Sequence, residues 1–397
     1  MSALASAAPD AAADLRGVAP VVIAAGGTGG HVVPALAVAD VLAARHVPVV
    51  WLGTRAGLEA RLVPAAGIEI RWIDVAGLRG KGLVGTLTGP SRLVRACLQS
   101  VAALRALRPR AVLGMGGFVS GPVALAALAC RCPLVLHEQN AIPGMTNRLL
   151  ARFATRVFSA WPGVFAASVD ARTVGNPVRH DIAALARTAR DARPREGDGP
   201  GTAPVSGSND ERGGATTASA PLRVLVVGGS RGARALNETV PGAIARLGER
   251  VTVRHQSGLD EADAVRARYA DVAATVSVEP FVDDMARAYA EADLVVCRSG
   301  AMTVTELAAL GVPSILVPFP HAVDDHQSAN ARRLSDEGAA VLMPQATLTS
   351  GRLADEIRRL DTARDALRAM GVAARGTFLA GAAETVADAL TGEGARR

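Results

Sequence analysis

Three glycine-rich turns are the first candidates for chemistry in this sequence of 397 residues. They occupy 26–30, 114–117 and 228–232, and each follows a short apolar run and precedes a segment of helical character. A helix that begins after such a turn presents free backbone N–H groups and the positive end of its dipole, which together attract a phosphate. One such turn can be purely structural, because glycine tolerates tight backbone geometry, but three in one chain favour phosphate chemistry.

None of these turns carries the signature of a common nucleotide-binding family. The pattern GxxxxGK[ST] does not occur in the sequence, which argues against a P-loop NTPase. No turn is followed by the full dinucleotide fingerprint with its acidic residue about 20 positions on, so NAD binding is a weak second alternative.

His31 directly follows the first turn, at the start of a helix predicted over 31–45. The positive end of the helix dipole favours the neutral imidazole, which can accept a proton from a hydroxyl group. A histidine that caps or packs the helix is an equally weighted alternative.

Glu306 lies in the first turns of another predicted helix, after the segment 298–300. A carboxylate there can accept two hydrogen bonds from a vicinal diol such as a ribose, whereas propensity alone favours an ordinary glutamate that interacts with the helix dipole.

Arg179 is a candidate phosphate ligand, or else a solvated surface arginine. The acidic pairs 283–284 and 324–325 have no companion ligands at supporting spacing, so we predict no metal site.

An alternation of strands, loops and helices must position these residues. Short β-branched runs predict strands at 21–25, 47–52, 111–113, 134–136, 222–227, 251–253, 294–296 and 314–317. Strands that alternate with helices predict parallel sheets with right-handed crossovers. The fold class is therefore α/β, with two Rossmann-like domains that face each other across a cleft and bind ligands at the carboxyl ends of their strands.

A change in composition along the chain indicates where the domains end. The segment after 185 is rich in Gly, Ser, Thr, Pro and Ala and has no apolar periodicity, which is typical of a disordered linker. A final helix is predicted over 354–389, and the sequence leaves open whether it returns to the first domain. We expect a flexible N-terminal tail (1–18), an N-terminal Rossmann-like domain (19–185), a disordered insertion (186–221), a C-terminal Rossmann-like domain (222–380) and the end of the C-terminal helix with its tail (381–397).

The overall composition excludes several classes of protein. With 49% hydrophobic and 20% charged residues, the chain is not wholly disordered. Its four cysteines are no disulfide framework, its N-terminus does not resemble a signal peptide, and no apolar run approaches the roughly 18 residues that span a bilayer. The net charge of +6 suggests an anionic partner.

Several longer segments together resemble one family, the MurG glycosyltransferases of bacterial peptidoglycan synthesis. The matches run in order across nearly the whole chain, apart from the N-terminal tail and the insertion. They are GGTGGHVVPALAVA (26–39), GLRGKG (77–82), GMGGFVSGP (114–122), HEQNAIPGMTNRLLA (137–151), VGNPVR (174–179), VVGGSRGARALN (226–237), HQSG (255–258), FVDDMARAYAEADLVVCRSGAMTVTEL (281–307) and VPFPHAVDDHQSANA (317–331).

The resemblance implies a GT-B fold and a defined reaction. N-acetylglucosamine moves from UDP-N-acetylglucosamine to the 4-hydroxyl of the muramoyl sugar of undecaprenyl-diphospho-muramoylpentapeptide (lipid I), which gives lipid II. The α-linked donor becomes a β-1,4 glycoside, and this inversion requires one base and no covalent nucleophile. UDP-N-acetylglucosamine is a substrate, so no cofactor is implied, and no essential metal is implied, because helix ends and arginine can stabilise the leaving UDP.

The resemblance also implies roles for individual residues. His31 is our candidate for the catalytic base, and Gly26, Gly27, Gly116 and Gly117 are expected to face the acceptor diphosphate. The third turn is expected to face the UDP phosphates. The expected donor contacts are Thr28, Gly29, Gly30, Asn140, Arg179, Ser230, Val282, Ala301, Met302, Thr303, Val304, Thr305, Glu306 and Gln327.

The sequence departs from the family pattern at three places. The stretch 193–220 exceeds what is expected of the family. Arg231 follows Ser230 where glutamine is common. The loop at 322–326 is one residue longer than in some members, so Gln327 rather than His326 is assigned by its spacing to Asn330.

The basic charge is concentrated in one window of the first domain. Residues 75–137 contain eight Lys and Arg residues and no acidic residue, and apolar residues lie beside the basic ones. This combination suits an anionic lipid surface, although a buried crossover helix with solvated arginines is the alternative. We expect a peripheral protein on the cytoplasmic face of the inner membrane, with membrane-facing residues Lys81, Leu83, Val84, Leu87, Arg92 and Arg95.

Two alternatives to lipid I glycosylation stay open at this stage. One is another GT-B enzyme that uses the same nucleotide sugar, such as an epimerase or a glycolipid synthase. The other is a non-catalytic nucleotide-sugar-binding scaffold in a complex with other cell-wall synthesis proteins, which are further candidate partners. Nucleic acid is not an expected partner, since the sequence shows no recognition module or set of stacking aromatic residues.

Overall fold

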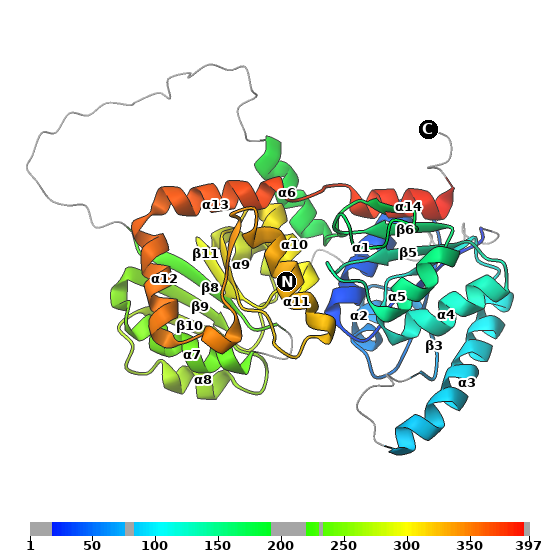
Figure 1. Cartoon of the computed structure of the whole chain (residues 1–397), viewed down its shortest axis with the longest axis horizontal. Coiled ribbons are helices and arrows are strands. Elements are labelled where there is room, and N and C mark those ends of the chain that lie inside the picture. Colours follow the sequence, from blue (N-terminus) through cyan, green and yellow to red (C-terminus); the bar gives the residue numbers. More distant parts are fainter. Residues whose placement is uncertain (1–17, 76–82, 192–219, 230–232, 393–397) are drawn as a thin grey trace, which may run out of the picture.

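The computed structural model describes residues 18–75, 83–191, 220–229 and 233–392, with the backbone alone at 83–89 and 189–191. Within these ranges the chain forms two α/β domains that lie side by side (Figure 1). The N-terminal domain contains a seven-stranded sheet and the C-terminal domain a six-stranded one. Both sheets are parallel throughout, which confirms the predicted fold class.

The N-terminal sheet reverses its strand order beside its first strand. Its strands are β1 (Val21–Ala24), β2 (Val49–Gly53), β3 (Glu69–Trp72), β4 (Ala111–Gly114), β5 (Leu134–Glu138), β6 (Arg156–Ser159) and β7 (Ala171–Thr173). They lie in the order β3-β2-β1-β4-β5-β6-β7. The loops that leave β1 and β4 therefore diverge and open a crevice, where ligands bind in sheets of this kind.

The C-terminal sheet repeats this arrangement. Its strands are β8 (Leu222–Val227), β9 (Val251–Gln256), β10 (Thr275–Glu279), β11 (Leu294–Cys297), β12 (Ser314–Leu316) and β13 (Ala340–Leu342). Their order is β10-β9-β8-β11-β12-β13, so the reversal lies between β8 and β11. The glycine-rich turns thus follow the strands that border each reversal.

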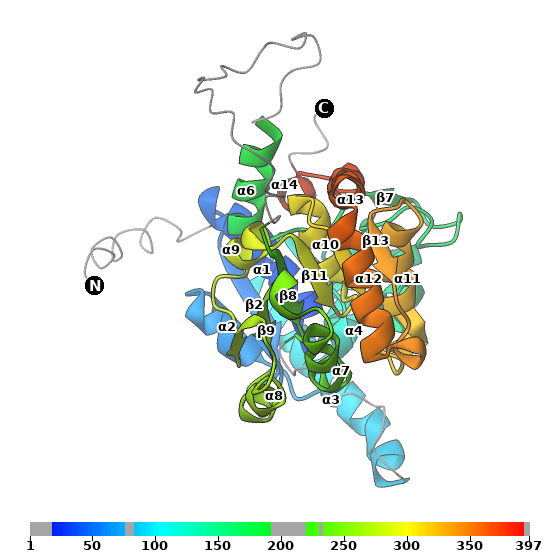
Figure 2. The ribbon, with the colours of Figure 1, turned by 90° about the vertical axis from the view of Figure 1, so that its left-hand side faces the viewer.

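Helices connect the strands and cover both faces of each sheet (Figures 1 and 2). In the N-terminal half they are α1 (Gly29–Ala44), α2 (Glu59–Ala65), α3 (Leu83–Leu107), α4 (Gly117–Ala129), α5 (Met145–Leu150), η1 (Ala151–Phe153) and α6 (His180–Asp191). In the C-terminal half they are α7 (Arg234–Ala245), η2 (Gly248–Arg250), α8 (Ala262–Arg268), α9 (Met285–Glu291), α10 (Ala301–Leu310), η3 (Val323–Asp325), α11 (His326–Ser335), η4 (Gln345–Thr347), α12 (Ser350–Thr362), α13 (Arg364–Gly376) and α14 (Ala382–Thr391). None of the helices in the described ranges has the length and apolar character needed to cross a membrane.

The central strands are buried on both faces, as their uninterrupted apolar sequences require. Val21 and Ile23 of β1 pack with α1 and α14, whereas Val22 and Ala24 pack with α3 and α4 on the opposite face. Successive side chains of a strand point to opposite faces, so a run of four small apolar residues serves two cores at once.

Two helices pack on the domain to which they do not belong by sequence. Ile182 of α6 lies in the core of the C-terminal domain with Tyr289 and Leu307. Val386 of α14 lies in the N-terminal core with Leu42 of α1. The helix α6 also continues to Asp191, beyond the boundary expected at 185. Residues 192–219 of the predicted insertion, the N-terminal tail to residue 17 and the C-terminal tail from 393 lie outside the described residues.

The prediction of a single helix over 354–389 is wrong, because the segment forms parts of α12, α13 and α14. Ala363 has φ −113° and ψ 60°, which interrupts the helical backbone between α12 and α13. Gly381 has φ 82°, a left-handed conformation that glycine adopts readily, and it directs α14 toward the first domain.

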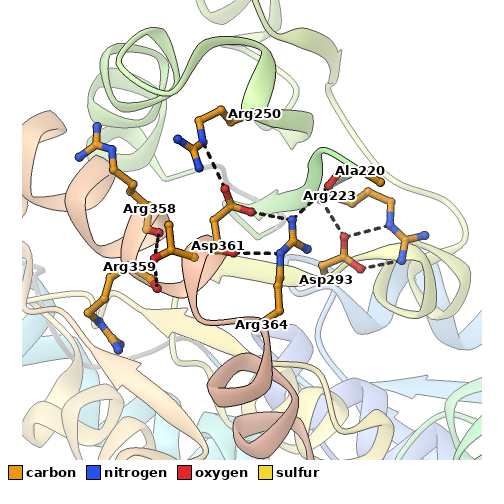
Figure 3. A network of polar contacts seen from close by, with 9 residues as sticks. Ala220, Arg223, Arg250, Asp293, Arg358, Arg359, Asp361 and Arg364 are labelled. Carbon is orange, nitrogen blue, oxygen red and sulfur yellow. Dashed lines mark hydrogen bonds and ion pairs between the residues drawn. The ribbon is translucent and has the colours of Figure 1, made fainter. Parts of the chain in front are cut away.

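Arginine–carboxylate pairs join the elements at the end of the C-terminal sheet where the strands begin (Figure 3). Arg223 at the start of β8 binds Asp293, which precedes β11, through Nη2 at 2.6 Å. The carboxylate of Asp361 in α12 forms ion pairs with Arg364 at 2.6 Å and with Arg250 at 3.4 Å. Because the strands are parallel, this network lies at the opposite end of the sheet from the glycine-rich turns.

The docking of α14 predicts that its apolar face stabilises the N-terminal domain. Leu390 is buried in that core, so Leu390→Ala should lower the free energy of unfolding by about 2–5 kcal/mol through lost burial and a residual cavity. Urea unfolding measures the change, and Leu259→Ala, at an exposed leucine of the C-terminal domain, is the matched control. Equal losses in the two variants would contradict a stabilising role for α14.

Candidate active site

A cavity of about 2710 Å³ opens between the two domains at the carboxyl ends of both sheets. Most of the predicted site residues line it. They are Gly27, Thr28, Gly29, Gly30, His31, Gly116, Gly117, Asn140, Arg179, Val282, Ala301, Met302, Thr303, Glu306 and Gln327, and Arg92, which was expected to face the membrane, lines the cavity as well. The predicted site therefore combines residues from both halves of the chain at one place in the fold.

The first turn presents helix-start amides to this cleft. The amides of His31 and Val32 both donate to the carbonyl of Thr28 at 3.2 Å, which closes the first turn of α1. Gly29 and Gly30 precede them, at positions whose N–H groups have no acceptor within a helix. These two amides and the helix dipole are suited to an anionic group.

Glu59, which no motif in the sequence marks, supports the first turn from the side away from the cleft. Its buried carboxylate accepts hydrogen bonds from the amide of Gly27 at 2.9 Å and from the amide and hydroxyl of Thr54 at 3.0 and 2.8 Å. A Cβ atom at Gly26 would come within 2.6 Å of this carboxylate. The amide of Gly27 is thus engaged by Glu59, and Gly26 leaves room for the carboxylate.

The second turn encloses His31. Gly116 and Gly117 have φ values of 93° and 77°, which strongly favour glycine. A Cβ atom at Gly116 would come within 2.9 Å of the Nδ1 and Cε1 atoms of His31, and one at Gly117 would overlap the carbonyl oxygen of Gly26. The imidazole therefore lies against the backbone of the second turn, between the two turns predicted to face a diphosphate.

The end of β5 and the residues that follow it form a buried polar cluster behind His31. Gln139 Oε1 lies 3.1 Å from His31 Nδ1, and Gln139 Nε2 lies 3.2 Å from His137 Nδ1. Glu138 accepts hydrogen bonds from the amides of Asn140 and Gly144, both at 3.0 Å, and so shapes the turn. Burial lowers the pKa of His137 to about 4, so its ring is neutral at neutral pH.

Three asparagines connect the domains around this cluster. Asn330 of α11 donates to Asn140 Oδ1 at 3.2 Å and accepts from the amide of Ala141 at 2.8 Å. Asn176, after β7, donates to the Thr305 hydroxyl of α10 at 2.9 Å. Asn140 and Thr305, both predicted donor contacts, thus take part in contacts between the domains.

Arg179 and Glu306 form an ion pair at the edge of the cleft, where Arg179 Nε donates to Glu306 Oε1 at 3.1 Å. Burial raises the pKa of the Glu306 carboxyl to about 7, although Arg179 opposes the rise. Arg179 contacts a carboxylate in this structure, whereas its place in the sequence predicted a phosphate ligand or a solvated surface arginine.

Comparison with known proteins identifies the family. Residues 21–159 match the glycosyltransferase family 28 N-terminal domain, and residues 223–386 match the family 28 C-terminal domain. The chain is 52% identical, over 369 residues, to the UDP-N-acetylglucosamine--N-acetylmuramyl-(pentapeptide) pyrophosphoryl-undecaprenol N-acetylglucosamine transferase of Methylococcus capsulatus, covering 92% of this chain and 96% of that protein. It is 48% identical to the protein of the same name from Cupriavidus necator, with coverage of 94% and 98%. The chain belongs to the MurG family.

Solved structures agree with this assignment. The crystal structure of Acinetobacter baumannii MurG superimposes with a TM-score of 0.75 at 38% identity and covers 94% of this chain and 99% of that one. A UDP-N-acetylglucosamine 2-epimerase structure reaches a TM-score of 0.63 at 14% identity, with coverage of 96% and 97%, which shows a shared fold alone. The predicted resemblance to the MurG family and the GT-B fold are confirmed.

Some residues carried over from the MurG family lie outside the cleft lining. Val304 is fully buried in the core of the C-terminal domain, and Thr305 is turned toward Ala301 and Asn176. Gly26, the first residue of the first turn, is buried against Glu59 and Val119. Ser230 and the neighbouring Arg231 lie outside the described residues, but Gln256 holds the start of the third turn, since it accepts from the Gly229 amide at 3.1 Å and donates to the Gly229 carbonyl at 3.0 Å.

Gln327, assigned by its spacing, lies at the start of α11. Its side-chain oxygen accepts from the amide of Phe319 at 2.9 Å, and its carbonyl accepts from the hydroxyl of Ser299 at 2.8 Å. The residue therefore ties α11 to the loops after β11 and β12. Among the described residues, no group of three or more His, Cys, Asp or Glu side chains is arranged to hold a metal ion.

The titration of Glu306 predicts a pH-dependent stability. Its pKa rises from 4.5 to about 7 on folding, so its contribution to stability is complete below pH 4.5 and is lost as the pH increases through 7. Glu306→Gln should therefore gain stability relative to the wild type across this range. Chemical unfolding at a series of pH values tests this, with the exposed Glu249→Gln as control; a constant difference for Glu306→Gln would contradict it.

Proposed function

We propose that this chain transfers N-acetylglucosamine from UDP-N-acetylglucosamine to the 4-hydroxyl of the muramoyl sugar of lipid I and so forms lipid II. The observation that carries the proposal is its near full-length identity of 52% to a transferase whose name states this activity. The cleft supports the proposal, because loops that precede helices line it in both domains. They surround a space large enough for two substrates.

The C-terminal domain is the proposed donor side. Gly300 caps α10 with an extended backbone and no side-chain cap, so the first amides of this helix are available to an anionic group such as a UDP phosphate. Glu306, two turns further into the same helix, is proposed to accept hydrogen bonds from the ribose hydroxyls. Arg179 would then remain beside the carboxylate and favour its ionised form, which accepts two bonds.

The N-terminal domain is the proposed acceptor side. The backbone of the first turn and that around Gly116 and Gly117 are proposed to receive the lipid diphosphate. In the first turn the amide of Gly27 is bound by Glu59, so we assign this role to the amides of Gly29 and Gly30, which were expected from the sequence to contact the donor. His31, between these turns, would remove the proton of the muramoyl 4-hydroxyl as its oxygen attacks the anomeric carbon. The bond from that carbon to the UDP oxygen breaks, its electron pair leaves with UDP, and the configuration inverts in one displacement.

A transfer assay tests this function. UDP-N-acetylglucosamine and a short-chain lipid I analogue should give a β-1,4-linked product, detectable by mass spectrometry and glycosidase digestion. His31→Ala should lower kcat by about 10²–10⁴-fold, the range that general-base catalysis supplies, and leave donor affinity unchanged.

The matched control is His46→Asn, at an exposed residue beyond the far end of α1, where asparagine tolerates the φ of 56°. It should retain activity. Donor hydrolysis or epimerisation without transfer would instead favour another GT-B enzyme of the same nucleotide sugar.

The start of α3 is the proposed membrane contact. This helix projects from the body of the N-terminal domain (Figures 1 and 2). Leu93, Val94 and Leu98 are 37%, 58% and 65% exposed, an unusual apolar surface beside the exposed Arg92 and Arg95. Lys81 and the side chains of Leu83, Val84 and Leu87 lie outside the described residues.

We infer peripheral binding to anionic lipids on the cytoplasmic face of the inner membrane. At about 1 kcal/mol per basic residue near such a surface, Arg92→Glu with Arg95→Glu should lower binding to phosphatidylglycerol vesicles by at least roughly tenfold. Co-sedimentation measures this at low and high salt. A control pair on the C-terminal domain, Arg246→Glu with Arg268→Glu, should bind like the wild type; binding that ignores both lipid charge and salt would contradict the proposal.

A further inference from the structure

A continuous chain of hydrogen bonds runs from the protein interior to His31. His137 Nε2 lies 2.9 Å from the carbonyl oxygen of Gly175, and His137 Nδ1 lies 3.2 Å from Gln139 Nε2. Gln139 Oε1 in turn lies 3.1 Å from His31 Nδ1. Gln139 and His137 are fully buried, whereas His31 lines the cleft, so the chain of hydrogen bonds ends at the cleft surface.

Two backbone carbonyls determine the direction of every bond in this chain. A carbonyl oxygen only accepts, so the bond to Gly175 requires a proton on His137 Nε2 and leaves Nδ1 of that ring as an acceptor. Gln139 Nε2 also lies 3.1 Å from the carbonyl of His137, which places the amide nitrogen, not the oxygen, at this end of the side chain. Gln139 Oε1 therefore faces His31, and His31 Nδ1 must carry the proton.

We propose that Gln139 is a positioning residue that holds His31 in the Nδ1–H tautomer, with the lone pair of Nε2 directed to the reacting hydroxyl. The proposal rests on the proposed function in one respect, which is that His31 is the base. The nitrogen that carries the proton in a neutral imidazole is set by the partner of the other nitrogen, and the free side chain prefers the opposite, Nε2–H, tautomer. Without Gln139, most His31 rings would present a proton instead of a lone pair.

The surroundings of the chain support this role. Burial keeps the pKa of His137 at about 4, so the ring stays neutral and Nδ1 stays an acceptor for Gln139 across the physiological range. The backbone at Gly116 lies directly against the His31 ring, where it restricts rotation. Gln139 carries no charge, so it orients the base without adding a carboxylate close to the anionic substrates.

Nuclear magnetic resonance of protein labelled with ¹⁵N-histidine reads the tautomer without any turnover. Two-bond proton–nitrogen correlations distinguish a protonated ring nitrogen from a bare one, and the chain has only seven histidines. The His31 signals are assigned by their loss in His31→Ala. At neutral pH the wild-type protein should show a protonated Nδ1 and a bare Nε2 at His31, and the reverse pattern would overturn the proposal even if Gln139→Leu does not fold.

The variant Gln139→Leu removes the acceptor and replaces the amide with an apolar side chain of similar size. Its His31 signals should shift toward the Nε2–H tautomer, and kcat should fall by roughly 10- to 100-fold, less than the whole contribution of a general base. The KM for UDP-N-acetylglucosamine should stay unchanged. An unaltered His31 tautomer in a folded Gln139→Leu protein would overturn the proposal.

His255 supplies an internal control in the same spectra. It is buried in the C-terminal domain between the Tyr269 hydroxyl at Nδ1 and Asn237 Oδ1 at Nε2, so it should show the Nε2–H tautomer in the wild type and in Gln139→Leu. A change in the His255 signals of Gln139→Leu would reveal a general loss of structure in that variant.

The two proposals can fail separately. If the wild-type protein transfers no sugar, the proposed function fails, whereas the tautomer of His31 and its dependence on Gln139 are still measured.

Discussion

The geometry of the cleft depends on the parallel pairing of β1 with β4. Ala24 lies opposite Gly114 in this register, so the turns that follow the two strands begin at the same level of the sheet. The backbone at Gly117 then approaches the carbonyl of Gly26 so closely that no Cβ atom fits between them. His31 lies against this junction. The position of the proposed base therefore follows from strand register and from glycine at one contact.

The contacts between the domains use the same residues as the site. Asn176 and Arg179 lie on the crossover that leads from β7 to α6, and they bind Thr305 and Glu306 of the C-terminal domain. Asn330 makes the reciprocal contact, from α11 to the loop after β5. Because α6 and α14 each pack on the other domain, any change in the angle between the domains acts on the contacts that shape both substrate sides.

Much of the fold could be predicted because its signals are local. Apolar β-branched runs followed by glycine-rich turns marked the central strands, and strand–helix alternation implied parallel sheets. The helix predicted over 354–389 failed for the opposite reason: amphipathic periodicity continues across Ala363, and which domain a helix packs against depends on distant surfaces. Glu59 was missed because its partners, Gly27 and Thr54, are brought to it only by the pairing of β1 with β2.

The fold class, the family and most of the predicted site residues that line the cleft follow from the amino-acid sequence alone, since they depend on residue types at short spacings that recur in order along the chain. How those residues act together depends on contacts that form only in the folded protein. Gln139 stands two positions from His137 but 108 from His31, and the orientation of its amide follows from the backbone carbonyl of His137. Hydrogen-bond direction is a property of atoms that meet in space, so no spacing in the sequence could specify it.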